Sequence, residues 1–144
     1  MTALFEHSPW VEERADARPS SGDRHADLMA VVRDASPDEQ LALIRAHPEL
    51  AGKAKVDLTE ASAAEQASAG LDRLTQAEYD RFHALNAAYR EKFGFPFIVC
   101  VRLTDKAGIL AAMESRLAND RATEIATAID EIGRIVRLRL ETAA

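Results

Sequence analysis

Signals that start helices recur along this chain, and they constrain its fold more than any other feature. Ser36–Glu39, Ser62–Glu65 and Thr75–Glu78 each place a hydroxyl residue three positions before a glutamate. In such a capping box, each of the two side chains accepts a hydrogen bond from a backbone N–H at the start of a helix. Pro9 and Pro37 each follow a serine, which suits the first position of a helix. We therefore predict an all-α fold.

Apolar periodicity between these signals predicts a single-domain bundle of about seven helices over residues 1–144. The helices are expected over residues 9–17, 23–34, 36–46, 62–70, 75–94, 105–117 and 121–140. Residues 53–58 are expected to form a loop. The apolar run Phe95–Val101 interrupts the pattern and is interpreted as either a short buried strand or an extended segment threading the core. The stripe from Ile125 to Val136 can bury either the chain's own core or a partner.

Composition narrows the function classes. The chain has 144 residues, of which 47% are hydrophobic and 29% charged, as in globular proteins. Its net charge of −6 argues against a nucleic-acid-binding face. There is no membrane-spanning apolar run, and Met1–Trp10 lacks the features of a signal peptide. The single cysteine, Cys100, excludes an internal disulfide and favours a reducing compartment. We expect a cytoplasmic protein.

His47 is the candidate that its backbone setting singles out. A helix is predicted to end at Ala46, and Pro48 disfavours the helical conformation for the residue before it. His47 should therefore sit at a rigid helix end, with Gly52 allowing a turn beyond it. An imidazole held there is suited to proton transfer, because its ordinary pKa lies near neutrality. The structural alternative stays open, since caps and turns also use histidine.

Other chemistries find less support in the sequence. His7 and His25 are expected at the surface, and His83 within a helix. No metal site is expected, because no two histidines stand four residues apart and one cysteine cannot build a thiolate site. Cys100 lies in an apolar run, where a thiol is usually an inert buried group. Glu65 and Arg116, taken singly, are explained as a capping-box carboxylate and a cation near a helix C-terminus.

Together, however, these residues form an ordered set of motifs. The set consists of Ser8-Pro9-Trp10, His47-Pro48-Glu49-Leu50-Ala51-Gly52, Ser62-x-x-Glu65-Gln66, Phe82-x-x-Leu85-Asn86-x-x-Tyr89-x-x-Lys92-Phe93-Gly94-Phe95-Pro96-Phe97-Ile98-Val99 and Arg116-Leu117-x-Asn119. From about Phe5 to Leu140, the chain resembles the 2-oxo-4-hydroxy-4-carboxy-5-ureidoimidazoline (OHCU) decarboxylases of urate breakdown. The block from Lys92 to Val99 is the most specific part of the resemblance.

The resemblance implies an all-helical homodimer that converts OHCU, a small-molecule substrate, to (S)-allantoin and carbon dioxide without a metal or organic cofactor. It maps the catalytic pair onto His47 and Glu65. The positions that it matches to substrate binding are Pro48, Ser62, Gln66, Phe97, Ile98, Val99 and Arg116, with main-chain groups of the 97–99 stretch expected to line the pocket.

Two departures from the family pattern leave the substrate open. The Gly52–Ser62 loop looks shorter than in some relatives, and Ala61 stands where an acidic residue often precedes the serine. One alternative is a decarboxylase of a related ureido acid. Another is a helical ligand-binding or interaction module without turnover, with which the capping boxes and the isoleucine stripe are equally compatible.

Overall fold

The protein folds into an all-α domain, as the capping signals predict. The computed structural model describes residues 4–5, 7–47, 50, 60–71 and 73–143, of which 60–62 and 142–143 are described by their backbone alone. These residues form seven α-helices, one short 3₁₀ helix and no strand. The helices are α1 (Trp10–Asp16), α2 (Arg24–Asp34), α3 (Pro37–Arg45), α4 (Glu60–Ser68), α5 (Gln76–Phe93), η1 (Val101–Leu103), α6 (Lys106–Arg116) and α7 (Arg121–Ala143).

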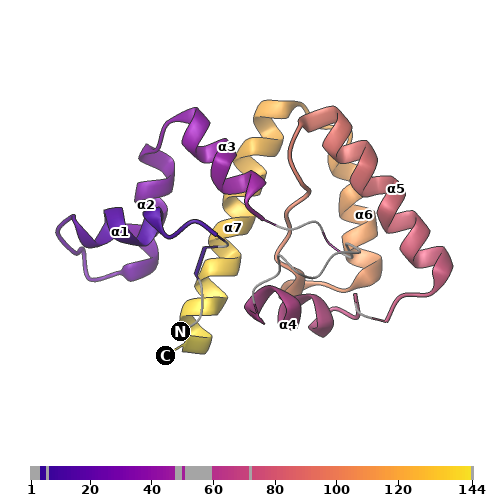
Figure 1. Cartoon of the computed structure of the whole chain (residues 1–144), viewed down its shortest axis with the longest axis horizontal. Coiled ribbons are helices and arrows are strands. Elements are labelled where there is room, and N and C mark those ends of the chain that lie inside the picture. The colour runs from indigo at the N-terminus through magenta and orange to yellow at the C-terminus, as the bar shows by residue number, and fades with distance from the viewer. Residues whose placement is uncertain (1–3, 6, 48–49, 51–59, 72, 144) are drawn as a thin grey trace.

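The long helix α7 runs through the middle of the domain, with α1–α3 on one side and α4–α6 on the other (Figure 1). It packs against α2 and α3, while α5 packs against α6 and α4 against η1. The predicted stripe on α7 faces this core: Ile129, Ile132 and Val136 are buried, and Ile125 is half-buried. The chain's own core therefore covers most of the stripe.

Local capping rules position most of these helices. The boxes Ser36–Glu39 and Thr75–Glu78 both form, with each hydroxyl and each glutamate accepting its expected backbone hydrogen bond. Gly94 ends α5 with a φ of 82°. Gly70 follows α4 with a φ of 81°, and the N–H of Leu71 donates to the carbonyl of Gln66 in the manner of a Schellman motif.

The third predicted box is wrong. Helix α4 begins at Glu60, so Ser62 and Glu65 lie within the helix rather than at its start. Glu60 and Ala61 are good helix formers, and nothing in them prevents the helix from beginning before the serine. The correction matters for function, because the Glu65 carboxylate is not used to cap its own helix.

The run Phe95–Val101 is an extended segment over Phe95–Cys100, and its last residue, Val101, begins η1, which decides between its two interpretations. Phe95, Phe97 and Ile98 are buried, and the Tyr89 ring makes edge contacts with Phe95 and Phe97 at centroid distances of 5.9 and 5.3 Å. Because no neighbouring strand is present among the described residues, the backbone polar groups of this segment cannot be satisfied by a ladder.

The structure also shows where two of the other histidines lie. His25 is half-buried rather than on the surface, and its Nε2 lies 2.8 Å from the Gly133 carbonyl on α7. His83 is an exposed residue of α5. Within the described part of the chain, no helix combines the length and apolarity needed to cross a bilayer. The loop predicted over residues 53–58 lies outside the described residues.

Candidate active site

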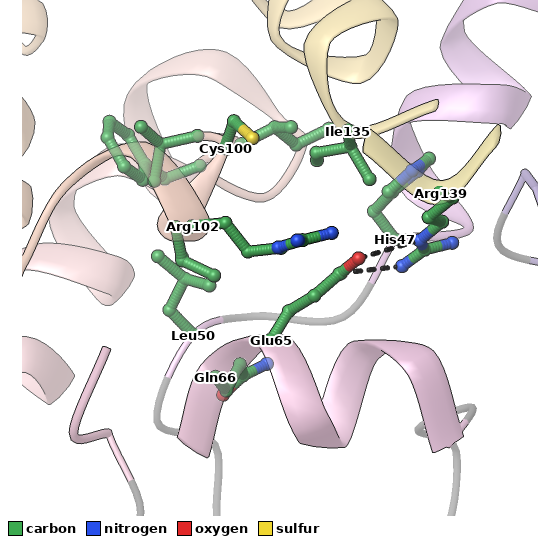
Figure 2. Close-up of a pocket in the computed structure, with 12 residues that line it drawn as sticks. His47, Leu50, Glu65, Gln66, Cys100, Arg102, Ile135 and Arg139 are labelled. Atoms are coloured by element: carbon green, nitrogen blue, oxygen red, sulfur yellow. Dashed lines mark hydrogen bonds and ion pairs between the residues drawn. The ribbon is translucent and has the colours of Figure 1, made fainter. Parts of the chain in front are cut away.

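A cavity that is partly open to solvent lies where α3, α4, α7 and the stretch 97–102 meet. His47 enters it from the end of α3 and Leu50 from the following turn, while Glu65 and Gln66 come from α4. The stretch 97–102 forms another wall, and α7 contributes Ile135 and Arg139. Figure 2 shows the side chains of Glu65 and Arg102 extending into this space.

His47 lies just beyond the C-terminal end of α3 and is only 8% exposed. Its Nδ1 is 2.9 Å from the carbonyl oxygen of Leu43, one turn back in the helix. Because a carbonyl can only accept, Nδ1 carries the proton of this hydrogen bond. In the neutral imidazole, Nε2 is then the basic nitrogen. The helix end thus fixes both the ring and the tautomer that a general base requires.

Glu65 forms a bidentate ion pair with Arg139 across the cavity (Figure 2). The Nε and NH2 groups of Arg139 lie 2.9 and 2.8 Å from the two carboxylate oxygens. The Arg139 side chain is 3% exposed and that of Glu65 is 13% exposed. Each oxygen of an ionised carboxylate has two lone pairs, so Glu65 can accept further hydrogen bonds from a ligand. Arg139 therefore holds the Glu65 carboxylate as a fixed acceptor at the wall of the cavity.

Three more side chains add to the chemistry of the cavity. Gln66 is half-buried and supplies an amide, and Arg102 is an exposed residue of η1 that supplies a second guanidinium. Cys100 is buried, and this burial, with the charge of the Glu131 carboxylate, raises the pKa of its thiol above the ordinary value. A thiol that stays protonated is a poor nucleophile, so Cys100 is a wall residue rather than a reactive group.

Phe97, Ile98 and Val99 line the cavity as expected, but Arg116 does not. The Arg116 side chain is buried on α6, where its Nε is 2.8 Å from Glu124 and its NH1 2.7 Å from the Ile98 carbonyl. It also lies over the Phe97 ring at 4.3 Å from the centroid. The structure thus places Arg116 behind the wall of the cavity, and the arginines on its surface are Arg102 and Arg139.

The side chains of two predicted site residues are not described, so their position relative to the cavity is not assigned. Pro48 lies outside the described residues, and Ser62 is described only by its backbone within α4. The Gly52–Ser62 departure likewise falls largely outside them. Among the described residues, no three His, Cys, Asp or Glu side chains gather as they would around a metal ion.

Sequence reasoning missed Arg102 and Arg139. Arg139 lies on α7 near its C-terminal end, where a cation is explained by the helix dipole alone. The available signal was its spacing: Arg139 follows Ile132 and Val136 by seven and three residues, which places it on the buried face of the helix. An arginine in line with a core stripe requires a buried partner, and here that partner is Glu65.

The fold and this cavity define an all-α domain with a buried histidine and a paired carboxylate at one site, and comparisons with known proteins agree on one family. The sequence model described as OHCU decarboxylase matches residues 1–141. The 2-oxo-4-hydroxy-4-carboxy-5-ureidoimidazoline decarboxylase of Haloferax volcanii is 46% identical over 140 residues, covering 95% of this chain and 82% of that protein. The chain belongs to the OHCU decarboxylase family.

Two other similarities extend this result. The uric acid degradation bifunctional protein PucL of Bacillus subtilis is 43% identical over 141 residues, which are 96% of this chain and 28% of that protein. The crystal structure of an (S)-allantoin synthase superposes with a TM-score of 0.74 at 31% identity, covering 96% of this chain and 46% of that one. The same domain thus occurs within longer proteins.

Proposed function

We propose that this protein is a carboxy-lyase that converts OHCU to (S)-allantoin and carbon dioxide in urate degradation. The observation that carries the proposal is the meeting of His47 with the Glu65–Arg139 pair in one cavity of a chain that belongs to this family. We propose that the domain needs no metal or organic cofactor, because the substrate itself holds the required electron sink.

The reaction can be written with its electrons balanced. The bond between the ring carbon and its carboxylate breaks, and carbon dioxide leaves. The bond's electron pair forms a carbon–carbon double bond, while the electrons of the adjacent imine move to its nitrogen, which takes up a proton. The resulting enol gives up its hydroxyl proton and gains a proton at the neighbouring carbon, which yields allantoin. Protonation from one face of the ring would set the S configuration.

His47 is proposed to accept a hydrogen bond from the substrate hydroxyl and to assist the transfer of its proton. Its Nδ1 donates to Leu43, so the neutral ring accepts at Nε2. A positioned acid–base group of this kind contributes ~10²–10⁴-fold to the rate. The histidine needs no movement to serve in this way, since the helix end already holds the ring.

Glu65, Arg139 and Gln66 are proposed to orient the substrate. The carboxylate of Glu65 suits N–H donors of the ureido arm, and the guanidinium of Arg139 holds that carboxylate in place. The amide of Gln66 can donate to the substrate or accept from it. Ser62, Pro48 and the 97–99 stretch keep the binding roles that the family resemblance implies. Arg116 is proposed to act from behind the wall rather than by direct contact.

A homodimer and a cytoplasmic location remain proposals that rest on the family resemblance and on the single cysteine. Because α7 already buries most of its stripe within the chain, a dimer would use another surface. Light scattering on the purified protein would give its mass in solution directly.

The reaction is tested by generating OHCU in place from urate with urate oxidase and hydroxyisourate hydrolase. Circular dichroism then follows the handedness of allantoin with and without this protein. Spontaneous decay gives racemic product, so rapid formation of optically active allantoin would support the proposal. A racemic product at the spontaneous rate, from folded protein, would overturn it.

The roles of the catalytic pair are tested by substitution. His47→Ala should lose nearly all turnover and remain folded, whereas His83→Ala, which changes an exposed histidine, should leave turnover unchanged. Glu65→Gln preserves size but removes charge, and should lower activity if the ion pair with Arg139 orients the substrate. Near-normal turnover in His47→Ala would show that His47 has only a structural role at the end of α3.

A further inference from the structure

The extended segment that lines the cavity is held from behind by two charged side chains. The NH1 group of Arg116 donates to the carbonyl of Ile98 at 2.7 Å, and the Glu131 carboxylate accepts the N–H of Cys100 at 3.1 Å. These contacts come from α6 and α7. They take the place of the neighbouring strand that such a segment would otherwise need.

Both holding residues are themselves fixed. Glu124, which is fully buried, accepts hydrogen bonds from Arg116, Tyr89 and Asn119 at 2.8, 2.6 and 2.8 Å. Glu131 is also buried, and its second oxygen pairs with the exposed Arg134 at 2.7 Å. These partners hold Arg116 and Glu131 in place, and hydrogen bonds from or to charged groups are stronger than those between neutral groups.

The two contacts fix the direction of the peptide groups on either side of Val99. In a planar trans peptide the C=O and N–H point in opposite directions. Holding the Ile98 carbonyl from behind therefore turns the N–H of Val99 the other way, and holding the Cys100 N–H does the same for the carbonyl of Val99. Val99 lies in the cavity wall, and no described residue forms a hydrogen bond with either of these two groups.

We propose that Arg116 and Glu131 are positioning residues that present the N–H and C=O of Val99 to the substrate as an adjacent donor and acceptor. Such a pair matches the edge of a ureido or cyclic amide group, which offers a C=O beside an N–H. The charges behind the wall also polarise both peptides, so that the Val99 N–H donates and its carbonyl accepts more strongly. This inference rests on the proposed function for the identity of the substrate.

Glu131→Ala tests the proposal because it removes the acceptor of the Cys100 N–H. The ureido edge does not change during decarboxylation, so its loss weakens ground and transition states alike. We expect KM for OHCU to rise about tenfold with kcat nearly unchanged. A merely structural role would instead lower the amount of active enzyme, reducing the apparent kcat at constant KM. Glu131→Gln, which keeps an acceptor oxygen, should restore KM to near the wild-type value.

Arg134→Ala is the matched control. It removes the exposed partner of Glu131 and leaves the contact with Cys100 in place, so KM should stay unchanged. An unchanged KM in folded Glu131→Ala would overturn the proposal, as would an equal rise in Arg134→Ala.

Nuclear magnetic resonance gives a readout that needs neither a folded Glu131→Ala nor turnover. Addition of (S)-allantoin to the wild-type protein should shift the Val99 amide signal more than the Gly94 amide signal, which lies at the end of α5 outside the cavity. A Val99 signal that does not respond to saturating allantoin would overturn the proposal. If the wild-type protein lacked turnover, the proposed reaction would fail while this titration still tested the geometry at Val99.

Discussion

Two buried arginine–glutamate pairs share α7 and differ in what surrounds their carboxylates. Glu124 lies in the first turn of the helix and pairs with Arg116, while Arg139 lies about 22 Å further along and pairs with Glu65. The Glu124 carboxylate is fully enclosed and receives donors from three protein side chains. Among the residues that the structure describes, Arg139 is the donor to the Glu65 carboxylate, which borders the cavity.

The difference shows that burial by itself does not distinguish a functional ion pair from a structural one. A carboxylate whose hydrogen-bonding capacity is satisfied by the protein can only hold structure together. One that keeps lone pairs at a cavity wall can also bind a ligand. On this criterion, the Arg116–Glu124 pair supports the wall, and the Glu65–Arg139 pair is the one that we propose to contact the substrate.

The largest expected effect comes from breaking the enclosed pair. Glu124→Ala leaves the Arg116 charge buried without its carboxylate and should lower the free energy of unfolding by about 3–5 kcal/mol. Urea unfolding followed by circular dichroism measures this. Asp130→Ala removes an exposed ion pair from the same helix and should cost less than about 1 kcal/mol. Equal stabilities of the two variants would contradict a structural role for the enclosed pair.

Changing the cavity pair should affect activity more than stability. Arg139→Lys keeps the charge but loses the planar fork that holds Glu65, and kcat/KM should fall about 100-fold because the substrate is misplaced. Arg137→Lys, two residues earlier on the exposed side of α7, should leave kcat/KM unchanged. A stability loss as large as that of Glu124→Ala, with activity retained, would show that the two pairs do not differ in role.

The same contrast explains which features were predictable from sequence. The starts of α3 and α5 follow from capping boxes, whose donors and acceptors lie within four residues of each other. His47 could be singled out because the proline beside it restricts its backbone. In each of these cases the deciding interaction is local, so a short stretch of sequence contains it.

Features that depend on distant residues could not be predicted in this way. Glu65 and Arg139 are 74 positions apart, and the local sequence around either residue does not predict that the two form an ion pair. The Ser62–Glu65 pattern predicts a helix start. The same two residue types at the same spacing can also lie inside a helix, so the sequence does not distinguish the two positions. The Arg116 motif predicts a contact with the substrate, whereas the contacts of Arg116 with Glu124 and the Ile98 carbonyl depend on how α6 and α7 pack around the extended segment.

Tyr89→Phe should give an intermediate effect on the enclosed pair. Burial, with the hydrogen bond to Glu124, raises the pKa of the Tyr89 hydroxyl well above its ordinary value of 10. Loss of that hydrogen bond to a charged group should cost about 1.5–3 kcal/mol at neutral pH. Above pH 10 the unfolded chain releases this proton before the folded one does, so the wild-type protein loses stability as pH rises. Urea unfolding at pH 7 and at pH 10.5 should show the difference between wild type and variant shrinking.

The smallest effect is expected at an exposed arginine–glutamate pair, which extends the comparison from the two buried pairs to one in contact with solvent. A hydrogen bond from Arg14, with a second from the Ser36 N–H, lowers the pKa of Glu39 to about 2. Its contribution to stability is therefore present above pH 4.5 and is lost as pH falls through 2. Arg14→Ala should raise the pKa of Glu39 but keep it below 4.5, because the Ser36 N–H still donates. Arg18→Ala, which alters another exposed pair, should leave it unchanged. Titration of the Glu39 side chain by nuclear magnetic resonance measures both, and a wild-type value near 4.5 would show that solvent screening removes the interaction even where the two side chains are in contact.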